Sequence, residues 1–108
     1  MGKAFLSLAT ATILHAVANG YSFGFDIVDI TGMPGGTVYP ALRRLEESGY
    51  LASEWEKERV AHAEQRPRRK YYQVTRSGRE VLGEALKRYR LLDQTALTTV
   101  REPKSSRA

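Results

Sequence analysis

The side chains best suited to chemistry in this sequence lie in one short segment, residues 35–50. A hydroxyl, a phenol and two guanidiniums occur there at spacings that put them on the outer face of a helix. Groups of these types bind phosphate oxygens and the base edges in the major groove of DNA. The chemistry they offer is therefore recognition of a polyanion. The four residues are Thr37, Tyr39, Arg43 and Arg44.

Basic residues are concentrated further along the chain, in residues 66–90. That stretch carries nine basic and two acidic side chains, net +7, whereas residues 1–65 carry five basic and eight acidic ones, net −3. A concentrated basic block attracts a polyanion, with nucleic acid the first candidate and an anionic membrane surface the second. The whole chain of 108 residues has a net charge of +5.

An amphipathic helix is expected to hold the polar side chains of residues 35–50. Because proline is tolerated in the first turn of a helix, Pro40 predicts a start near Thr37, whose hydroxyl is a natural N-cap. Gly49 predicts the end, since glycine adopts the left-handed conformation that closes a helix. One apolar stripe at i, i+4 and i+7 would face the core. It consists of Val38, Ala41, Leu42 and Leu45.

Two further helices are expected before this segment. The first runs from about Lys3 to Ala18 and is apolar on most of its circumference, so it should be buried on more than one side, one of them against a second subunit. The second is short, capped by Ser22, with Gly24 marking a place of close packing. Its core-facing positions are Phe23, Ile27 and Ile30. A breaker-rich turn over residues 31–35 then gives the spacing of a helix-turn-helix.

A β-hairpin, or wing, is expected after Gly49. Alternating residues predict a strand from Leu51 to Trp55 and a return strand over residues 69–74, joined by a polar connection without an apolar pattern. Tyr71 and Tyr72 should leave the return strand on opposite faces, so that one of them packs inward. The basic residues expected at or beside the tip are Arg66, Arg68, Arg69 and Lys70. Two plainer alternatives remain open at this point, an ordinary solvated helix and a solubilising surface loop.

The last helix is expected to begin at one of two caps. Thr75 is one candidate, and Ser77 with Glu80 three residues on forms a capping box and is the other. Downstream, apolar residues step by 3 and 4, the spacing of a coiled-coil seam. Two heptads are too few for a stable coiled coil, so this helix must lie against its own domain or against the first helix of a partner. The seam residues are Leu82, Ala85, Tyr89, Leu92 and Ala96.

The fold class that these elements predict is mainly α with a small β-hairpin, a winged helix-turn-helix followed by a long C-terminal dimerisation helix. The expected division is residues 1–74 for the DNA-binding domain, 75–102 for the dimerisation helix and 103–108 for a flexible tail. A chain of this length has room for one modest core.

Composition argues against several other classes of protein. Cysteine is absent, which excludes disulfides and thiolate metal sites and fits a reducing, cytoplasmic location. No stretch approaches the roughly 20 apolar residues that span a bilayer. His15 and His62 are far apart in sequence and have no ligand spacing, and Gly35-Gly36 lacks the lysine of a phosphate-binding loop. We therefore expect no enzyme activity, no metal, no cofactor and no membrane partner.

Three sequence motifs resemble the PadR family of winged helix-turn-helix transcriptional regulators. Residues 36–51 match the family signature G-T-[LV]-Y-P-x-L-x-R-L-E-x-x-G-[LY]-[LIV]. Residues 67–78 match the block P-R-K-Y-Y-x-[LV]-T-x-x-G, and residues 19–24 stand where the family has a His-Gly-Tyr-like turn. The resemblance covers roughly residues 4–92 and indicates the short form, without a large separate effector domain.

The resemblance implies a homodimeric repressor that binds an inverted-repeat operator in double-stranded DNA and is derepressed by a small-molecule effector or, as in some members, by another signal. It also implies roles for particular residues. The DNA contacts would be Tyr21, Ser22, Thr37, Tyr39, Pro40, Arg43, Arg44, Arg68, Arg69, Lys70 and Tyr71. The dimer interface would contain Phe5, Leu8, Leu82, Ala85, Leu86, Tyr89, Leu92 and Ala96. The alternative function is a winged-helix protein-interaction module without a DNA target.

Overall fold

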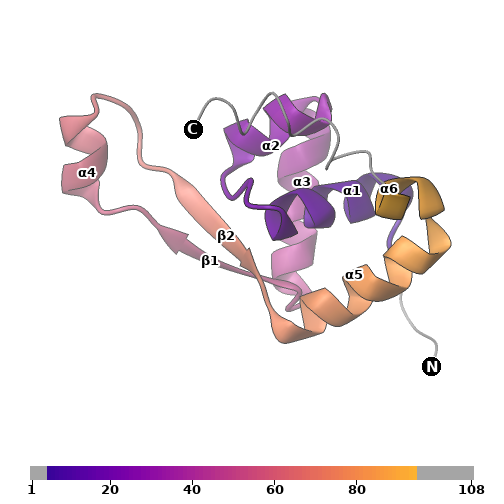
Figure 1. The fold of residues 1–108 in the computed structure, drawn as a ribbon. Coiled ribbons are helices and arrows are strands. Elements are labelled where there is room, and N and C mark those ends of the chain that lie inside the picture. The colour runs from indigo at the N-terminus through magenta and orange to yellow at the C-terminus, as the bar shows by residue number, and fades with distance from the viewer. Residues whose placement is uncertain (1–4, 95–108) are drawn as a thin grey trace.

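A computed structural model describes residues 5–94 of the chain as six helices and one hairpin (Figure 1). The predicted class, mainly helical with a two-stranded antiparallel hairpin, is confirmed. In chain order the elements are α1 (Leu8–Ala18), α2 (Gly24–Thr31), α3 (Gly35–Glu47), β1 (Leu51–Trp55), α4 (Glu58–Ala63), β2 (Lys70–Val74), α5 (Arg76–Arg88) and α6 (Arg90–Gln94).

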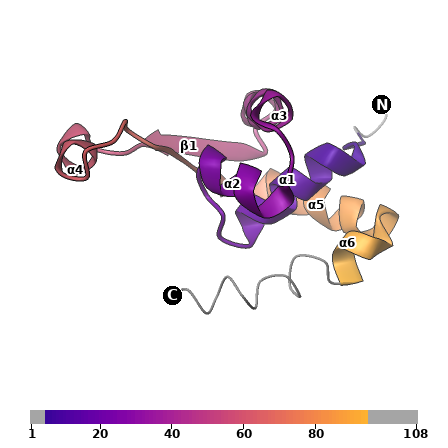
Figure 2. The same cartoon turned by 90° about the horizontal axis from the view of Figure 1, so that it is seen from above.

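Helix α1 is the centre of the core and contacts α2, α3 and α5. Figure 2 shows it between α3 on one side and α5 with α6 on the other. The helix begins at Leu8 and not near Lys3, which lies outside the described residues. Ser7 is the N-cap of α1, and its hydroxyl accepts a hydrogen bond of 3.1 Å from the Thr10 amide.

Helix α2 begins at Gly24 with Phe23 as its N-cap residue, so the predicted cap at Ser22 is wrong. The backbone at Ser22 is instead fixed to the hairpin, since its carbonyl accepts a hydrogen bond of 2.7 Å from the Tyr72 amide. Ile27 is fully buried and Ile30 packs against the core, as the sequence pattern predicted. The helix ends at Gly32, whose φ of 73° is left-handed.

Helix α3 begins two residues earlier than predicted, at Gly35. The carbonyl of Pro34 accepts hydrogen bonds from the amides of Thr37 and Val38, so Thr37 lies inside the first turn instead of capping it. Pro40 is therefore inside the helix, beyond the turn in which its missing N–H costs nothing. Proline at this place withholds a bond from the carbonyl four residues earlier, that of Gly36, which is exposed and can be hydrated.

The end of α3 is as predicted. Gly49 has a φ of 81°, and its amide donates to the Glu46 carbonyl at 3.0 Å. The Tyr50 amide donates to the Leu45 carbonyl at 2.9 Å. These two bonds form a Schellman motif, which only a residue tolerant of positive φ completes cheaply. The chain consequently turns directly from α3 into the hairpin.

Strands β1 and β2 pair antiparallel, with Leu51 opposite Val74 and Trp55 opposite Lys70. A bridge between Phe23 and Tyr71 joins the residues before α2 to the edge of β2 that does not pair with β1. Tyr72 packs into the core while Tyr71 is only half-buried, which confirms that the two tyrosines leave the strand on opposite faces. The hairpin is thereby joined to the helical body along one edge.

The connection between the strands holds a helix that sequence reasoning missed. Helix α4 forms the far end of the wing, remote from the body (Figure 1). It ends in a second Schellman pair, with the Gln65 amide on the His62 carbonyl and the Arg66 amide on the Ala61 carbonyl. Gln65 takes the left-handed position with a φ of 57°. The wing tip is therefore a structured turn of helix rather than an open loop.

The C-terminal part is two short helices within the described residues, not one uninterrupted helix. Of the two predicted caps the structure has Thr75, whose hydroxyl accepts from the Gly78 amide at 3.0 Å. Helix α5 stops at Arg88, and Tyr89 leaves the helical conformation with its hydroxyl donating to the Leu6 carbonyl at 2.7 Å. Ala96 and the predicted tail, residues 103–108, lie outside the described part of the chain.

Candidate nucleic-acid interface

Helix α3 holds its four polar side chains outward because its apolar stripe is fully inside. Val38, Ala41, Leu42 and Leu45 are buried, as predicted. A helix anchored by such a stripe presents its opposite face as a rigid surface. On that face Thr37, Tyr39, Arg43 and Arg44 are all exposed, and Pro40 is half-buried.

The Tyr39 ring packs directly on the backbone of α2. A Cβ at Gly24 would overlap the ring, so only glycine leaves the space that the phenol occupies. The ring nevertheless remains 48% exposed. The close packing predicted at Gly24 is thus confirmed, and its partner is a side chain on the outer face of α3. A role for Gly24 in positioning the Tyr39 hydroxyl is a prediction.

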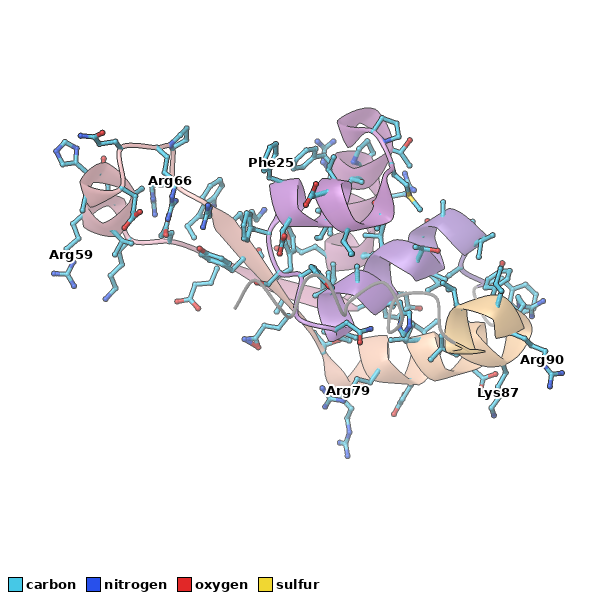
Figure 3. All side chains as sticks on the ribbon, turned by 45° about the horizontal axis from the view of Figure 1, so that its top comes forward. Phe25, Arg59, Arg66, Arg79, Lys87 and Arg90 are labelled. Carbon is cyan, nitrogen blue, oxygen red and sulfur yellow. The ribbon has the colours of Figure 1, made fainter. Side chains whose placement is uncertain are left out.

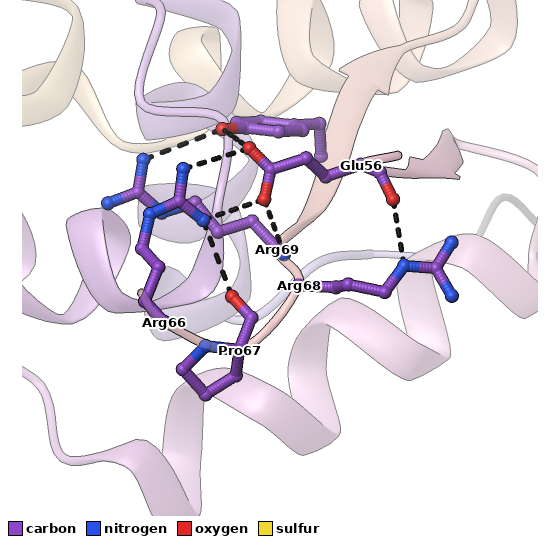
Figure 4. Close-up of polar contacts among 6 residues, drawn as sticks. Glu56, Arg66, Pro67, Arg68 and Arg69 are labelled. Carbon is purple, nitrogen blue, oxygen red and sulfur yellow. Dashed lines mark hydrogen bonds and ion pairs between the residues drawn. The ribbon is translucent and has the colours of Figure 1, made fainter. Parts of the chain in front are cut away.

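Glu56 organises the base of the wing tip (Figure 4). Its carboxylate accepts two hydrogen bonds from the Arg66 guanidinium, at 2.6 and 2.9 Å, and one from the Arg69 amide at 3.2 Å. The Arg66 bonds are the main reason that the pKa of the Glu56 carboxyl falls to about 2. The same pair raises the pKa of the Arg66 guanidinium. Arg66 is therefore neutralised by Glu56 and contributes little charge to the surface of the wing.

Positive charge lies on the stem of the wing, not at its tip as the sequence suggested. Helix α4 occupies the tip, and its neighbourhood, residues 56–66, carries three basic and three acidic side chains. The basic residues beyond it lie over aromatic rings on the two faces of the hairpin. Arg68 lies over Trp55 at 5.6 Å from the ring centroid, on the face that Trp55 shares with Lys70. Arg69 lies over Phe23 at 4.1 Å, on the opposite face. We call Trp55, Arg68 and Lys70 the cationic stem.

Lys70 joins the cationic stem to α3. Its Nζ lies 3.3 Å from Glu46 Oε1, and Glu46 Oε2 accepts a hydrogen bond from the Ser53 hydroxyl. The Ser53 bond, and then Lys70, lower the pKa of the Glu46 carboxyl. Both partners of the ion pair are about one-third exposed, so its direct contribution to stability is small. The contact shows that the hairpin, whose position is set by its strand pairing, brings Lys70 beside α3.

Tyr72 is buried in the core and lies beside Lys70 of the stem. Burial raises the pKa of the Tyr72 phenol, and the nearby charges of Lys70, Glu46 and Arg43 also act on it. Tyr71, on the other face, packs edge-on against Phe23 with centroids 5.7 Å apart. Its hydroxyl donates to Glu56 at 3.5 Å. Of the two tyrosines Tyr71 is the accessible one, as predicted, although much of its ring is occupied within the chain.

The structure gives Tyr21 and Ser22 roles in the fold. Tyr21 is 1% exposed in the core, and its amide donates to the Ala16 carbonyl. A side chain so deeply buried cannot reach DNA, so the contact assigned to Tyr21 is corrected to a core position. Ser22 is half-buried and its carbonyl is bonded to Tyr72. A contact between Ser22 and a DNA phosphate stays a prediction.

The basic block of residues 66–90 divides between two sides of the molecule. Figure 3 shows Arg79, Lys87 and Arg90 directed away from the body on the α5–α6 side. Helix α1 lies between that side and α3 (Figure 2). Only the cationic stem therefore adds its charge to the surface that α3 presents, and the α5 cations can act on a distant polyanion only through the long-range field.

The predicted dimer residues fall into two groups. Leu82, Ala85 and Leu92 are buried against α1 and its neighbours within the chain, whereas Leu86 and Tyr89 are half-buried. The other two, Phe5 and Leu8, are 69% and 54% exposed, and Arg88 lies over the Phe5 ring at 3.8 Å. A homodimer through these residues stays a prediction, with Phe5 and Leu8 the ones that have surface to offer.

Three functional residues escaped sequence reasoning. Trp55 was seen only as a strand residue, although its position two residues after Ser53 puts it on the face that packs toward α3. Glu46 and Glu56 were given no role, because their partners are 24 and 10 residues away in sequence. Strand alternation could have identified Trp55, but no local signal identifies the two carboxylates.

The described part of the chain also has one open cavity that is relevant to ligand binding. An open cavity of about 320 Å³ lies beside Phe5, Thr10, Arg44 and Tyr50. Over residues 5–94 no group of three or more His, Asp or Glu side chains could hold a metal ion. Within the same range none of the helices combines the length and apolar character needed to cross a bilayer.

Comparison with known proteins places this architecture among transcription regulators. The model of the transcriptional regulator PadR-like family matches residues 13–84, which include α3 and both strands of the wing. Among solved structures, smu.1704 from Streptococcus mutans UA159 is 30% identical over 87% of this chain and 89% of its own, with a TM-score of 0.65. A PadR-like transcription factor from Bacteroides fragilis is 28% identical over 79% of this chain and 82% of its own, with a TM-score of 0.63.

A third solved structure shares the fold at lower identity. BpsR from Bordetella bronchiseptica, whose DNA binding is regulated by 6-hydroxynicotinic acid, is 21% identical over 87% of this chain and 67% of its own, with a TM-score of 0.66. No curated protein matches the sequence.

Proposed function

The chain belongs to the PadR-like family of transcriptional regulators, and we propose that it acts as a homodimer that binds an inverted-repeat operator in double-stranded DNA and represses transcription. In this proposal α3 enters the major groove, where Thr37 and Tyr39 meet base edges and Arg43 and Arg44 meet phosphates. The wing contacts the flanking backbone. Such a protein would work in the cytoplasm, where it meets its DNA.

One observation carries the proposal most directly. Lys70 Nζ lies 3.3 Å from the Glu46 carboxylate of α3, so the hydrogen-bonding helix and the stem cations form one continuous surface. A surface with a central helix and a basic flank has the form expected of a duplex-binding winged helix. Two copies with their α3 helices about 34–36 Å apart would enter successive major grooves.

A small-molecule effector is the remaining part of the proposal. It is supported by the solved Bordetella bronchiseptica regulator, whose DNA binding responds to a small ligand. The cavity beside Arg44 is the place we favour on this chain, since an occupant there would touch a side chain that we assign to DNA. A ligand at this place should lower duplex affinity in the wild type and have less effect on an Arg44→Gln variant.

The test is selection of bound sequences from a random duplex pool at two salt concentrations. We expect an inverted repeat to be enriched, and affinity to fall with salt with a log–log slope of about −0.9 per phosphate neutralised. Arg68→Gln should reduce that slope by about one phosphate, because Arg68 belongs to the cationic stem. The matched control is Lys87→Gln, which removes one exposed cation from the α5–α6 side and should leave the slope nearly unchanged.

The outcomes separate the alternatives. A flat salt dependence without sequence enrichment would favour the protein-interaction module. A protein that stays monomeric and binds no duplex DNA in dilute buffer would contradict the proposed homodimeric, DNA-binding function. Equal slopes for the Arg68 and Lys87 variants would show that the cations facing the duplex are distributed differently from our assignment.

A further inference from the structure

Trp55 is the only tryptophan of the chain, and the structure leaves it 54% exposed. It lies at the end of β1, opposite Lys70 in the ladder. Strand alternation puts it on the same face as Ser53 and Tyr72, the residues that pack toward α3. The indole therefore faces the side of the wing on which α3 presents its polar groups.

The surroundings of the indole are cationic. Lys70 Nζ lies 5.7 Å from the Trp55 ring centroid and equally far from that of Tyr72, while the Arg68 guanidinium lies 5.6 Å from the indole. The Arg68 Nε donates to the Glu56 carbonyl at 2.8 Å, which holds its side chain beside the ring. Figure 4 shows Arg68 extending away from the Glu56 carboxylate that binds Arg66.

The Trp55 indole belongs to neither apolar cluster of the described residues. The apolar core is formed without it, because Leu51 and Tyr72 close the body end of the same face. Large aromatic side chains beside cations are typical of surfaces that bind nucleic acids, where the ring packs on sugars or bases and the cations neutralise adjacent phosphates.

We propose that Trp55, with Arg68 and Lys70, forms a second DNA-binding element on the wing, in which the indole packs against the deoxyribose wall of the minor groove and the two cations hold the phosphates on either side. The inference rests on the proposed function and adds a residue and a groove to it. A paired duplex offers sugar edges at its surface and keeps its bases stacked, so we commit to the sugar as the partner of the ring.

The chain supplies its own reporter, since all tryptophan fluorescence comes from this one position. The experiment titrates the full chain with a fluorescently labelled duplex pool of about 30 base pairs, long enough for two half-sites one helical turn apart. Anisotropy of the label measures binding, and emission of Trp55 is read in parallel. We expect Trp55 emission to change with the same midpoint as the anisotropy.

Variants test whether the contact contributes to binding. Trp55→Ala should lower duplex affinity about tenfold, in line with the loss of one aromatic contact, and Trp55→Phe should recover part of it. The matched control is Val60→Ala, which truncates another exposed apolar side chain of the wing and should leave affinity unchanged. Circular dichroism melts of each variant check that the fold is retained.

Several results would overturn the inference. If the labelled duplex binds while Trp55 emission stays constant, or if Trp55→Ala binds within twofold of the wild type, the indole does not touch DNA although the proposed function stands. Tighter binding of the separated single strand, with stronger quenching, would replace sugar packing by stacking on unpaired bases. If the wild type binds no duplex at all, the proposed function itself fails and the inference with it.

Discussion

At the scale of single residues, the wing depends on one carboxylate. Glu56 receives hydrogen bonds from Arg66, from the Arg69 amide and from the Tyr71 hydroxyl. Removing an acceptor shared by three donors leaves each of them to find water. The order of the wing base should therefore depend on the charge of Glu56.

That dependence gives a pH prediction. The Arg66 guanidinium holds the pKa of the Glu56 carboxyl at about 2, below its ordinary value of 4.5. The unfolded chain takes up the proton first as pH falls, so the stabilisation is complete above about pH 4.5 and is lost as pH falls toward about 2. We expect the difference in thermal midpoint between wild type and Glu56→Gln to shrink across that window. Glu54→Gln, an exposed neighbour on β1, is the control and should show no such trend.

Gly24 gives a second prediction at this scale. Gly24→Ala would push the Tyr39 ring off the α2 backbone, and because the ring is the mobile end of a side chain, the fold should survive the change. We expect little change in the thermal midpoint. We also expect the preference for particular base pairs at the positions that Tyr39 contacts to fall roughly tenfold. Binding-site selection measures this. A variant with unchanged sequence preference would contradict the positioning role of Gly24.

At the scale of elements, the sequence predicted those whose signals are local. The stop at Gly49 and the two alternating strands were found because positive φ and period-2 burial leave marks on the residues themselves. Helix α4 was missed because its end position is held by Gln65 instead of glycine and because six residues are too few for a helical period. The break at Tyr89 was missed because its cause is a hydrogen bond to Leu6.

The start of α3 shows a rule applied too strictly. Pro40 was taken to lie in the first turn, yet it lies further in, where the carbonyl it deprives belongs to exposed Gly36. Proline inside a helix removes one hydrogen bond and crowds the carbonyl four residues earlier, and exposure of Gly36 lets water replace the lost bond. The candidate site was accordingly found in outline, since the exposed residues of α3 were named correctly, while the pairing of Lys70 with Glu46 required tertiary structure.

The joint between the wing and α5 gives a prediction for elements. A Cβ at Gly78 would overlap the backbone carbonyl oxygen of Tyr50, and backbone cannot move aside easily. Gly78→Ala should therefore destabilise the fold by about 1–3 kcal/mol in urea unfolding. Gly83, in the same helix, has open space around its Cα, so Gly83→Ala should stabilise by up to about 1 kcal/mol. Equal effects of the two substitutions would contradict close packing at this joint.

At the scale of the whole molecule, Phe5 and Leu8 are exposed apolar side chains near α1 that can pair two copies. Leu8 is the first residue of α1, a position where an acidic side chain suits the helix dipole. Leu8→Asp should thus keep the helix while placing a charge in a dimer interface. We expect a monomer in sedimentation experiments, and affinity for an inverted repeat lowered by more than about tenfold, since the second half-site no longer adds to binding.

The control for this prediction is Val60→Asp, which puts the same charge on the wing tip, far from α1 (Figure 1). It should leave the dimer intact. A dimer that withstands Leu8→Asp would move the interface away from the start of α1, toward the α5–α6 side.

The edge bond between Ser22 and Tyr72 also bears on how the protein behaves when concentrated. A two-stranded ribbon with bare edges is a template on which further strands can polymerise into fibrils. Here the flank of β2 nearest the body is already occupied by the residues that precede α2, so growth would have to start on the β1 flank. On that flank β1 carries the exposed Glu54, and a charged side chain on an edge strand opposes the addition of further strands.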